Sequence, residues 1–149
     1  MRKLVLSLII VGVLLAGCSG TSSKKAESIV KDLYQAAFNK EFSEVDSLLI
    51  HLPEYDRYAE EFQEDLYDTV ADLGGMNHLK IDTPNEKLIN QELINGLNNE
   101  FDDNWKMVCV KMDENYFMVW ILQEIDGDLY IIDGEDFNGD ELFISDDSK

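Results

Sequence analysis

Apolar residues recur at helical spacing through the first half of the chain, which predicts a series of amphipathic helices. The first is expected over residues 26–41, where apolar positions fall at intervals of three or four: Ala26, Ile29, Val30, Leu33, Tyr34 and Ala37. Ser43 and Asp46 have the spacing of a capping box. A short second helix is therefore expected to begin at Ser43 and to run through Leu49.

A longer apolar stripe follows Pro53, a residue that suits the first position of a helix because it lacks an N–H. The apolar positions behind Pro53 fall on one helical face: Tyr55, Tyr58, Phe62, Leu66, Val70 and Leu73. Gly74 and Gly75 tolerate the left-handed conformation that ends many helices. The third helix is therefore expected to stop at this glycine pair.

The second half of the chain favours strands. A first strand is expected over residues 76–81 and a fourth helix over residues 84–98, where Thr83 and Glu86 form a second capping box. Three runs rich in β-branched and aromatic residues then cover 105–112, 116–125 and 129–132. The sequence thus predicts an α+β fold, with N-terminal helices packed on a curved antiparallel sheet of about four strands.

Two-residue turns at Glu114-Asn115 and Asp126-Gly127 would fix which side chains of these strands share a face, because side chains alternate along a strand. One face would be mainly aliphatic and would support the helices. The other is a candidate face for a protein partner, a second copy of the chain or an apolar ligand: Trp105, Met107, Met118, Trp120 and Leu122. Two alternatives stay open. The fourth helix or the C-terminal segment could cover this face, or a three-residue first turn could shift the first strand.

The N-terminus has the pattern of an export signal. Arg2 and Lys3 precede an apolar run over residues 4–15, which is shorter than the ~20 residues that a membrane-spanning helix needs. The run ends in Leu15-Ala16-Gly17-Cys18, which resembles the lipobox of bacterial lipoproteins. This resemblance implies that residues 1–17 are a signal peptide and that Cys18 carries the lipid that anchors the protein to the extracytoplasmic side of the cell membrane.

The remaining chain divides into three parts. Residues 18–25 are small and polar after Cys18, so they are expected to form a flexible tether. Residues 26–144 are expected to form a single domain, and residues 145–149 an acidic tail.

Charge and composition exclude several kinds of partner. The formal net charge is −19, from 31 acidic and 12 basic residues, and such a surface repels phosphate groups. Direct binding of nucleic acid or of lipid headgroups is therefore not expected. With Cys18 lipidated, Cys109 has no partner for an internal disulfide, and a thiol within an apolar strand is usually inert.

No metal site or cofactor is expected. His51 and His78 lack the spacing of zinc ligands. The acidic segment Asp133–Asp140 is expected to be a loop. It does not fit the EF-hand template, so a solvated acidic surface is the better interpretation. Nucleophile–base motifs and phosphate-binding loops are also missing from the sequence, and no residue is assigned a catalytic role.

Three segments carry a family resemblance: the alanine pair and phenylalanine at 36–38, the acidic-hydrophobic segment 42–49, and the Gly-Gly exit into a strand at 73–81. In these segments and in the strands that follow, the chain resembles exported lipoproteins of the NTF2-like superfamily. The resemblance implies a cone-shaped, cystatin-like domain of helices on a sheet, often with a pocket or a dimer face, and it implies no reaction.

Two classes of function follow from these observations. The first is a membrane-anchored lipoprotein that acts as a binding or protein-interaction module. The alternative is an enzyme, or a binder of small apolar ligands, that uses a pocket between the helices and the sheet. Some NTF2-like enzymes move protons in such a pocket with a carboxylate base and a tyrosine or second acid, but no Asp–Tyr pair here is distinguished by its position in the sequence.

Overall fold

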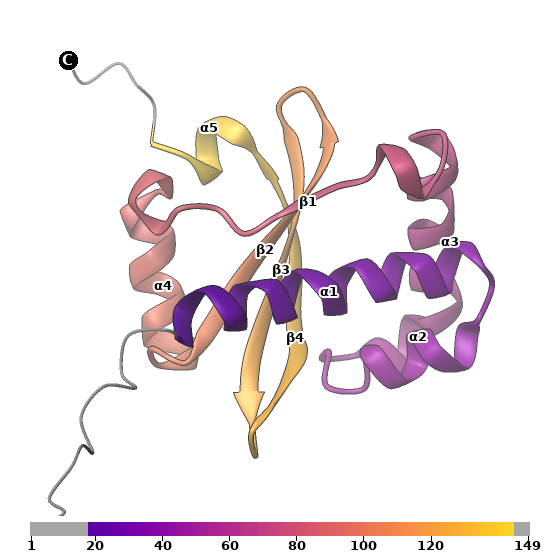
Figure 1. The fold of residues 1–149 in the computed structure, drawn as a ribbon, viewed down its shortest axis with the longest axis horizontal. Helices are drawn as coiled ribbons and strands as arrows, with labels where there is room; N and C mark the ends of the chain where they lie inside the picture. Colours follow the sequence, from indigo (N-terminus) through magenta and orange to yellow (C-terminus); the bar gives the residue numbers. More distant parts are fainter. Residues whose placement is uncertain (1–17, 145–149) are drawn as a thin grey trace, which may run out of the picture.

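The computed structural model describes residues 18–144, which fold as helices on an open, antiparallel sheet. In chain order the elements are α1 (Cys18–Phe38), α2 (Phe42–Leu48), α3 (Tyr55–Asp72), η1 (Met76–His78), β1 (Lys80–Asp82), η2 (Glu86–Leu88), α4 (Gln91–Phe101), β2 (Trp105–Asp113), β3 (Tyr116–Ile125), β4 (Asp128–Asn138) and α5 (Gly139–Leu142). The four strands in this range lie in the order β1-β2-β3-β4. Figure 1 shows α1 crossing the sheet, with α2 and α3 to one side and α4 and α5 to the other. The predicted α+β class is confirmed.

The first helix begins earlier than its apolar stripe suggests. Because α1 starts at Cys18, residues 18–25 belong to its first turns, and the flexible tether expected there is wrong. Lys25 in this part of the helix forms an ion pair with Asp128 at the start of β4, with an N–O distance of 3.3 Å. Within residues 18–144 no helix has the length and apolar character that crossing a membrane requires. The expected signal peptide, residues 1–17, and acidic tail, residues 145–149, lie outside the described residues.

The ends of α2 and α3 differ from the sequence predictions. Ser43 lies within α2, which begins at Phe42, so the capping box expected at Ser43 is wrong. Pro53 precedes α3, and Glu54 at its N-cap has a positive φ of 62°. The exit from α3 is confirmed, because Gly74 and Gly75 have φ angles of 87° and 107°.

The chain between α3 and α4 is less regular than expected. Of the strand expected over residues 76–81, only residues 80 and 81 belong to β1, and η1 occupies residues 76–78. The helix start predicted from a capping box at Thr83 is also wrong. Asn90 caps α4 instead, and its side chain accepts a hydrogen bond of 3.0 Å from the Glu92 N–H. This segment is held by an antiparallel bridge between Ile89 and Phe143, which ties the start of α4 to the end of α5.

Apolar cores cover both faces of the sheet. One core lies between the sheet and the helices α1, α2 and α3, and its sheet residues are Val108, Val110, Trp120, Leu122 and Ile131. The other lies beneath α4 and α5, and its sheet residues are Trp105, Met107, Cys109, Val119, Ile121 and Ile132. The alternative in which the fourth helix or the C-terminal segment covers the candidate face is correct for Trp105 and Met107 alone.

A β-bulge explains why the predicted faces were wrong. The turn at Glu114-Asn115 brings Asp113 opposite Tyr116 as expected, but the next pair is Lys111 with Phe117, so Met112 is an extra residue. This single insertion places Val108 opposite Trp120 on the same face. The five residues of the candidate partner face are consequently divided between the two cores.

The hairpin between β3 and β4 forms as predicted. Asp126 and Gly127 have φ angles of 53° and 89°, which fits the two-residue turn expected for this pair. β4 nevertheless continues well past residue 132, and most of the acidic segment that follows Ile132 is strand rather than loop. Asp136 in this extension lies opposite Met118.

Candidate functional site

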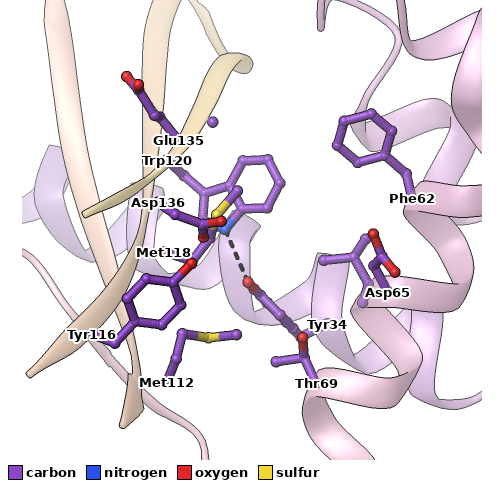
Figure 2. A pocket seen from close by; sticks show the side chains of 12 residues that line it. Tyr34, Phe62, Asp65, Thr69, Met112, Tyr116, Met118, Trp120, Glu135 and Asp136 are labelled. Atoms are coloured by element: carbon purple, nitrogen blue, oxygen red, sulfur yellow. Dashed lines mark hydrogen bonds between the residues drawn. The ribbon is translucent and has the colours of Figure 1, made fainter. Parts of the chain in front are cut away.

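A pocket of about 320 Å³ lies between the helices and the sheet. It opens between α1 and α3 on one side and β2, β3 and β4 on the other, so residues far apart in the sequence meet there. Figure 2 shows the side chains that line it: Tyr34, Phe62, Asp65, Leu66, Thr69, Met112, Tyr116, Met118, Trp120, Gly134, Glu135 and Asp136. Its volume lies at the lower end of the range for small-ligand sites.

The floor of the pocket is a pair of buried aromatic rings. Tyr34 of α1 and Trp120 of β3 are 1% and 0% exposed, and their rings meet edge to face with centroids 6.4 Å apart. The indole N–H of Trp120 donates to the Tyr34 hydroxyl at 3.2 Å. This bond joins α1 to the centre of the sheet beneath the pocket (Figure 2).

The O–H group of Tyr34 does not donate a hydrogen bond to any described residue. Its oxygen accepts from Trp120, and no residue in the described part of the chain accepts its proton. Burial is the main cause that raises the pKa of Tyr34 well above its ordinary value, and the negative charge of Asp136 adds to the effect. The hydroxyl therefore stays protonated at neutral pH and is available to donate to a ligand.

Gly134 of β4 makes room for the Trp120 ring. The two residues are opposite one another in the sheet. A Cβ added at Gly134 would lie only 2.6 Å from the Cζ3 atom of Trp120 and 3.0 Å from the Cε of Met118. The indole can lie this close to the β4 backbone only because position 134 has no side chain.

The mouth of the pocket is acidic. Asp65 on α3 and Asp136 on β4 are exposed and approach the pocket from opposite sides, whereas the Glu135 carboxylate points away from it (Figure 2). Tyr116 donates a hydrogen bond to Asp136, which raises the pKa of Tyr116. The described lining contains no Lys, Arg or His to balance these charges.

The structure places the sequence-predicted site residues in three environments. Met118 and Trp120 line the pocket, while Leu122 is fully buried in the core next to it. Trp105 and Met107 lie under α4, where the Trp105 indole N–H donates to Asn98 at 2.8 Å. Cys18, the proposed lipidation site, is the first residue of α1.

The sequence analysis did not identify the helical and β4 residues of the pocket. Tyr34 and Phe62 were assigned to apolar stripes, and Asp65 was not distinguished from other exposed acids of α3. One signal was present: an isolated glycine in an extended segment often marks the close approach of another group. Gly134 was instead assigned to a loop.

The remaining candidates for chemistry are structural. Cys109 is buried, and burial together with the charge of Asp82 raises the pKa of its thiol to about 12, so it is unreactive at neutral pH. The His51 ring packs against Tyr130 with a centroid distance of 4.4 Å. Residues 18–144 bring together no group of three or more His, Cys, Asp and Glu side chains that could hold a metal ion.

Comparisons with protein-family models, with curated proteins and with solved structures find no match to this chain. The geometry of the pocket is therefore the basis for the function proposed below.

Proposed function

We propose that this protein is an extracytoplasmic lipoprotein, anchored to the cell membrane through Cys18, whose NTF2-like domain binds a small ligand between its helices and its sheet. The observation that carries the proposal is the pocket of about 320 Å³ over the Tyr34–Trp120 pair. Ligand sites are typically concave and mostly apolar, with a few polar groups that fix orientation. The pocket has this character.

Two features favour ligand binding over a partner on the open sheet. Both sheet faces are already covered by helices, which removes the apolar surface that a protein partner or second copy would need. The pocket, in contrast, retains an unused hydroxyl donor at its floor and two exposed carboxylates at its mouth. These polar groups converge on one volume.

The proposed anchor rests on the sequence pattern that ends at Cys18. Because α1 begins at that residue and continues into the domain core, the lipid would be joined to the domain through a helix. Two acyl chains on one cysteine would give stable attachment, with ~0.8 kcal/mol for each buried CH₂. The domain would then be held close to the membrane.

Trp120 provides a direct test, because the chain contains two tryptophans and only Trp120 lines the pocket. In a Trp105→Phe protein, purified from membranes in non-ionic detergent, all indole emission comes from Trp120. We expect a small-molecule extract of the source organism's envelope and medium to change this emission in a saturable way.

A matched pair of variants identifies where the ligand binds. Thr69→Phe, made in the Trp105→Phe background, puts a ring into the pocket from α3 and should abolish the response. Ala71→Phe adds the same ring at an exposed position of α3 outside the lining and should preserve it. An emission that does not change with the extract, or that changes equally in Thr69→Phe, would refute the proposal.

A further inference from the structure

We infer that the ligand of this pocket is a small organic cation, an ammonium group on a short apolar body that also carries a hydrogen-bond acceptor. The inference rests on the proposed ligand-binding function and adds the chemical class of the ligand. It follows from three properties of the lining: aromatic walls, unbalanced negative charge, and a buried donor.

The aromatic walls suit a cation. Phe62 of α3 and Tyr116 of β3 present rings at the two sides of the pocket, and Trp120 closes the floor between them (Figure 2). The face of an aromatic ring carries negative electrostatic potential, which attracts ammonium groups. The apolar carbons around the charge would contact Met112 and Met118, whose flexible side chains adapt to irregular shapes.

The negative charge at the mouth of the pocket favours a positively charged ligand. Asp65 and Asp136 come from separate elements and flank the opening, and the described lining supplies no basic group that pairs with them. A cation that enters between the two carboxylates gains attraction from both, whereas an anion is repelled. The net charge of −19 adds a long-range field that steers cations toward the protein.

The floor of the pocket favours a ligand that carries a hydrogen-bond acceptor. The Tyr34 hydroxyl is buried, protonated and without an acceptor among the described residues. A hydroxyl or carbonyl oxygen on the ligand would accept this proton. The exposed mouth therefore fits the positive end of the ligand, and the floor fits a neutral polar end.

Choline is a suitable probe, because it combines a trimethylammonium group with a hydroxyl. Its neutral isostere, dimethylbutanol, replaces the charged group with tert-butyl at nearly constant shape. Titration calorimetry of the full chain, purified from membranes in non-ionic detergent, should show choline binding about ten-fold or more tightly than dimethylbutanol. Dimethylbutyrate, an anion of similar size, should not bind.

Charge-removing variants assign the selectivity to the pocket. Asp65→Asn and Asp136→Asn should each weaken choline binding about two- to five-fold and leave dimethylbutanol binding unchanged. Asp72→Asn removes the same charge from an exposed site two turns further along α3, outside the lining, and should have no effect.

The outcomes separate the ligand class from the proposed function. Suppose that dimethylbutanol or dimethylbutyrate binds as tightly as choline and that Thr69→Phe abolishes this binding. That result would overturn the inference that the ligand is a cation, and the pocket would remain a ligand site. Choline binding that Asp72→Asn weakens as much as Asp65→Asn would also overturn the inference, because the selectivity would then reflect net charge alone. Absence of binding by all three probes would overturn the cation and leave the proposed function to the Trp120 emission test, whose own failure would overturn both proposals.

Discussion

The contact between Gly134 and Trp120 sets the shape of the pocket floor. The Trp120 ring occupies the space that a side chain at position 134 would need, with 2.6 Å between its Cζ3 atom and an added Cβ. We expect Gly134→Ala to push the ring off the β4 backbone and to lower the free energy of unfolding by about 1 to 3 kcal/mol. Chemical denaturation of the two proteins measures this difference.

Gly96 provides the matched control. It lies inside α4, and an added Cβ there would meet no atom within 4 Å. Since glycine destabilises a helix interior relative to alanine, Gly96→Ala should raise the free energy of unfolding by about 0.5 to 1 kcal/mol. Equal effects of the two glycine-to-alanine changes would contradict the role assigned to Gly134.

Individual residues of the core were easier to predict than their roles. The spacing of Leu33, Tyr34, Leu66 and Val70 along the helices correctly placed them on buried faces. The sequence could not indicate that Tyr34 and Trp120 form a hydrogen bond, because 86 positions separate them and their contact depends on how α1 crosses the sheet. The pocket was missed for the same reason.

Among the elements, strand positions were predicted better than strand register. The second of the three β-rich runs matches β3, and the first matches β2 to within one residue. The extra residue at Met112 then reversed the faces of β2 relative to β3. A bulge of this kind changes no local pattern of apolar residues, so periodicity alone gave the wrong partition.

Helix starts were also poorly predicted, because capping motifs are weak local signals. Ser43 and Thr83 both had suitable spacing, yet α2 begins one residue earlier and α4 is capped by Asn90. The position of α4 is fixed by pairing at a distance: the Asn90 N–H donates to the Leu142 carbonyl at 2.9 Å. Tertiary contacts therefore overrode the local preference.

A polar network joins α2 to α3, and it predicts that the stability of the fold falls at alkaline pH. The Tyr55 hydroxyl donates to the Asp46 carboxylate at 2.7 Å, and Gln63 donates to both groups. Burial first, and then the bond to Asp46, raises the pKa of Tyr55 from 10.0 to about 12. Because the folded state holds the phenol proton more tightly, this contribution to stability is complete below pH 10 and is lost between pH 10 and about 12.

Tyr55→Phe removes this group. We expect the variant to be less stable than wild type by about 1 to 2 kcal/mol at neutral pH. The difference in free energy of unfolding between the two proteins should narrow as the pH rises above 10, the ordinary pKa of tyrosine. Taking the difference between the two proteins cancels the titration of Tyr34 and Cys109. A gap that stays constant across the alkaline range would show that Tyr55 does not exchange its proton differently in the folded state.

For the molecule as a whole, the lipid anchor is the prediction that rests most directly on sequence. Cys18→Ser removes the thiol that would accept the lipid, so the variant should keep residues 1–17 and show no acyl mass. Mass spectrometry of the intact protein from membranes measures both. Cys109→Ser leaves the proposed site intact and should be processed as wild type. A Cys18→Ser protein that is still cleaved and acylated would refute the assignment.

The pocket above Tyr34 and Trp120 is proposed to hold a small cationic ligand. The most direct measurement is the mass of whatever small molecule is released on denaturation of the protein purified from its own membranes. We predict that wild type and Ala71→Phe release the same low-mass cation and that Thr69→Phe, which fills the pocket, releases none. Release of the same molecules from all three proteins, or of no cation from wild type, would contradict the proposed cationic ligand.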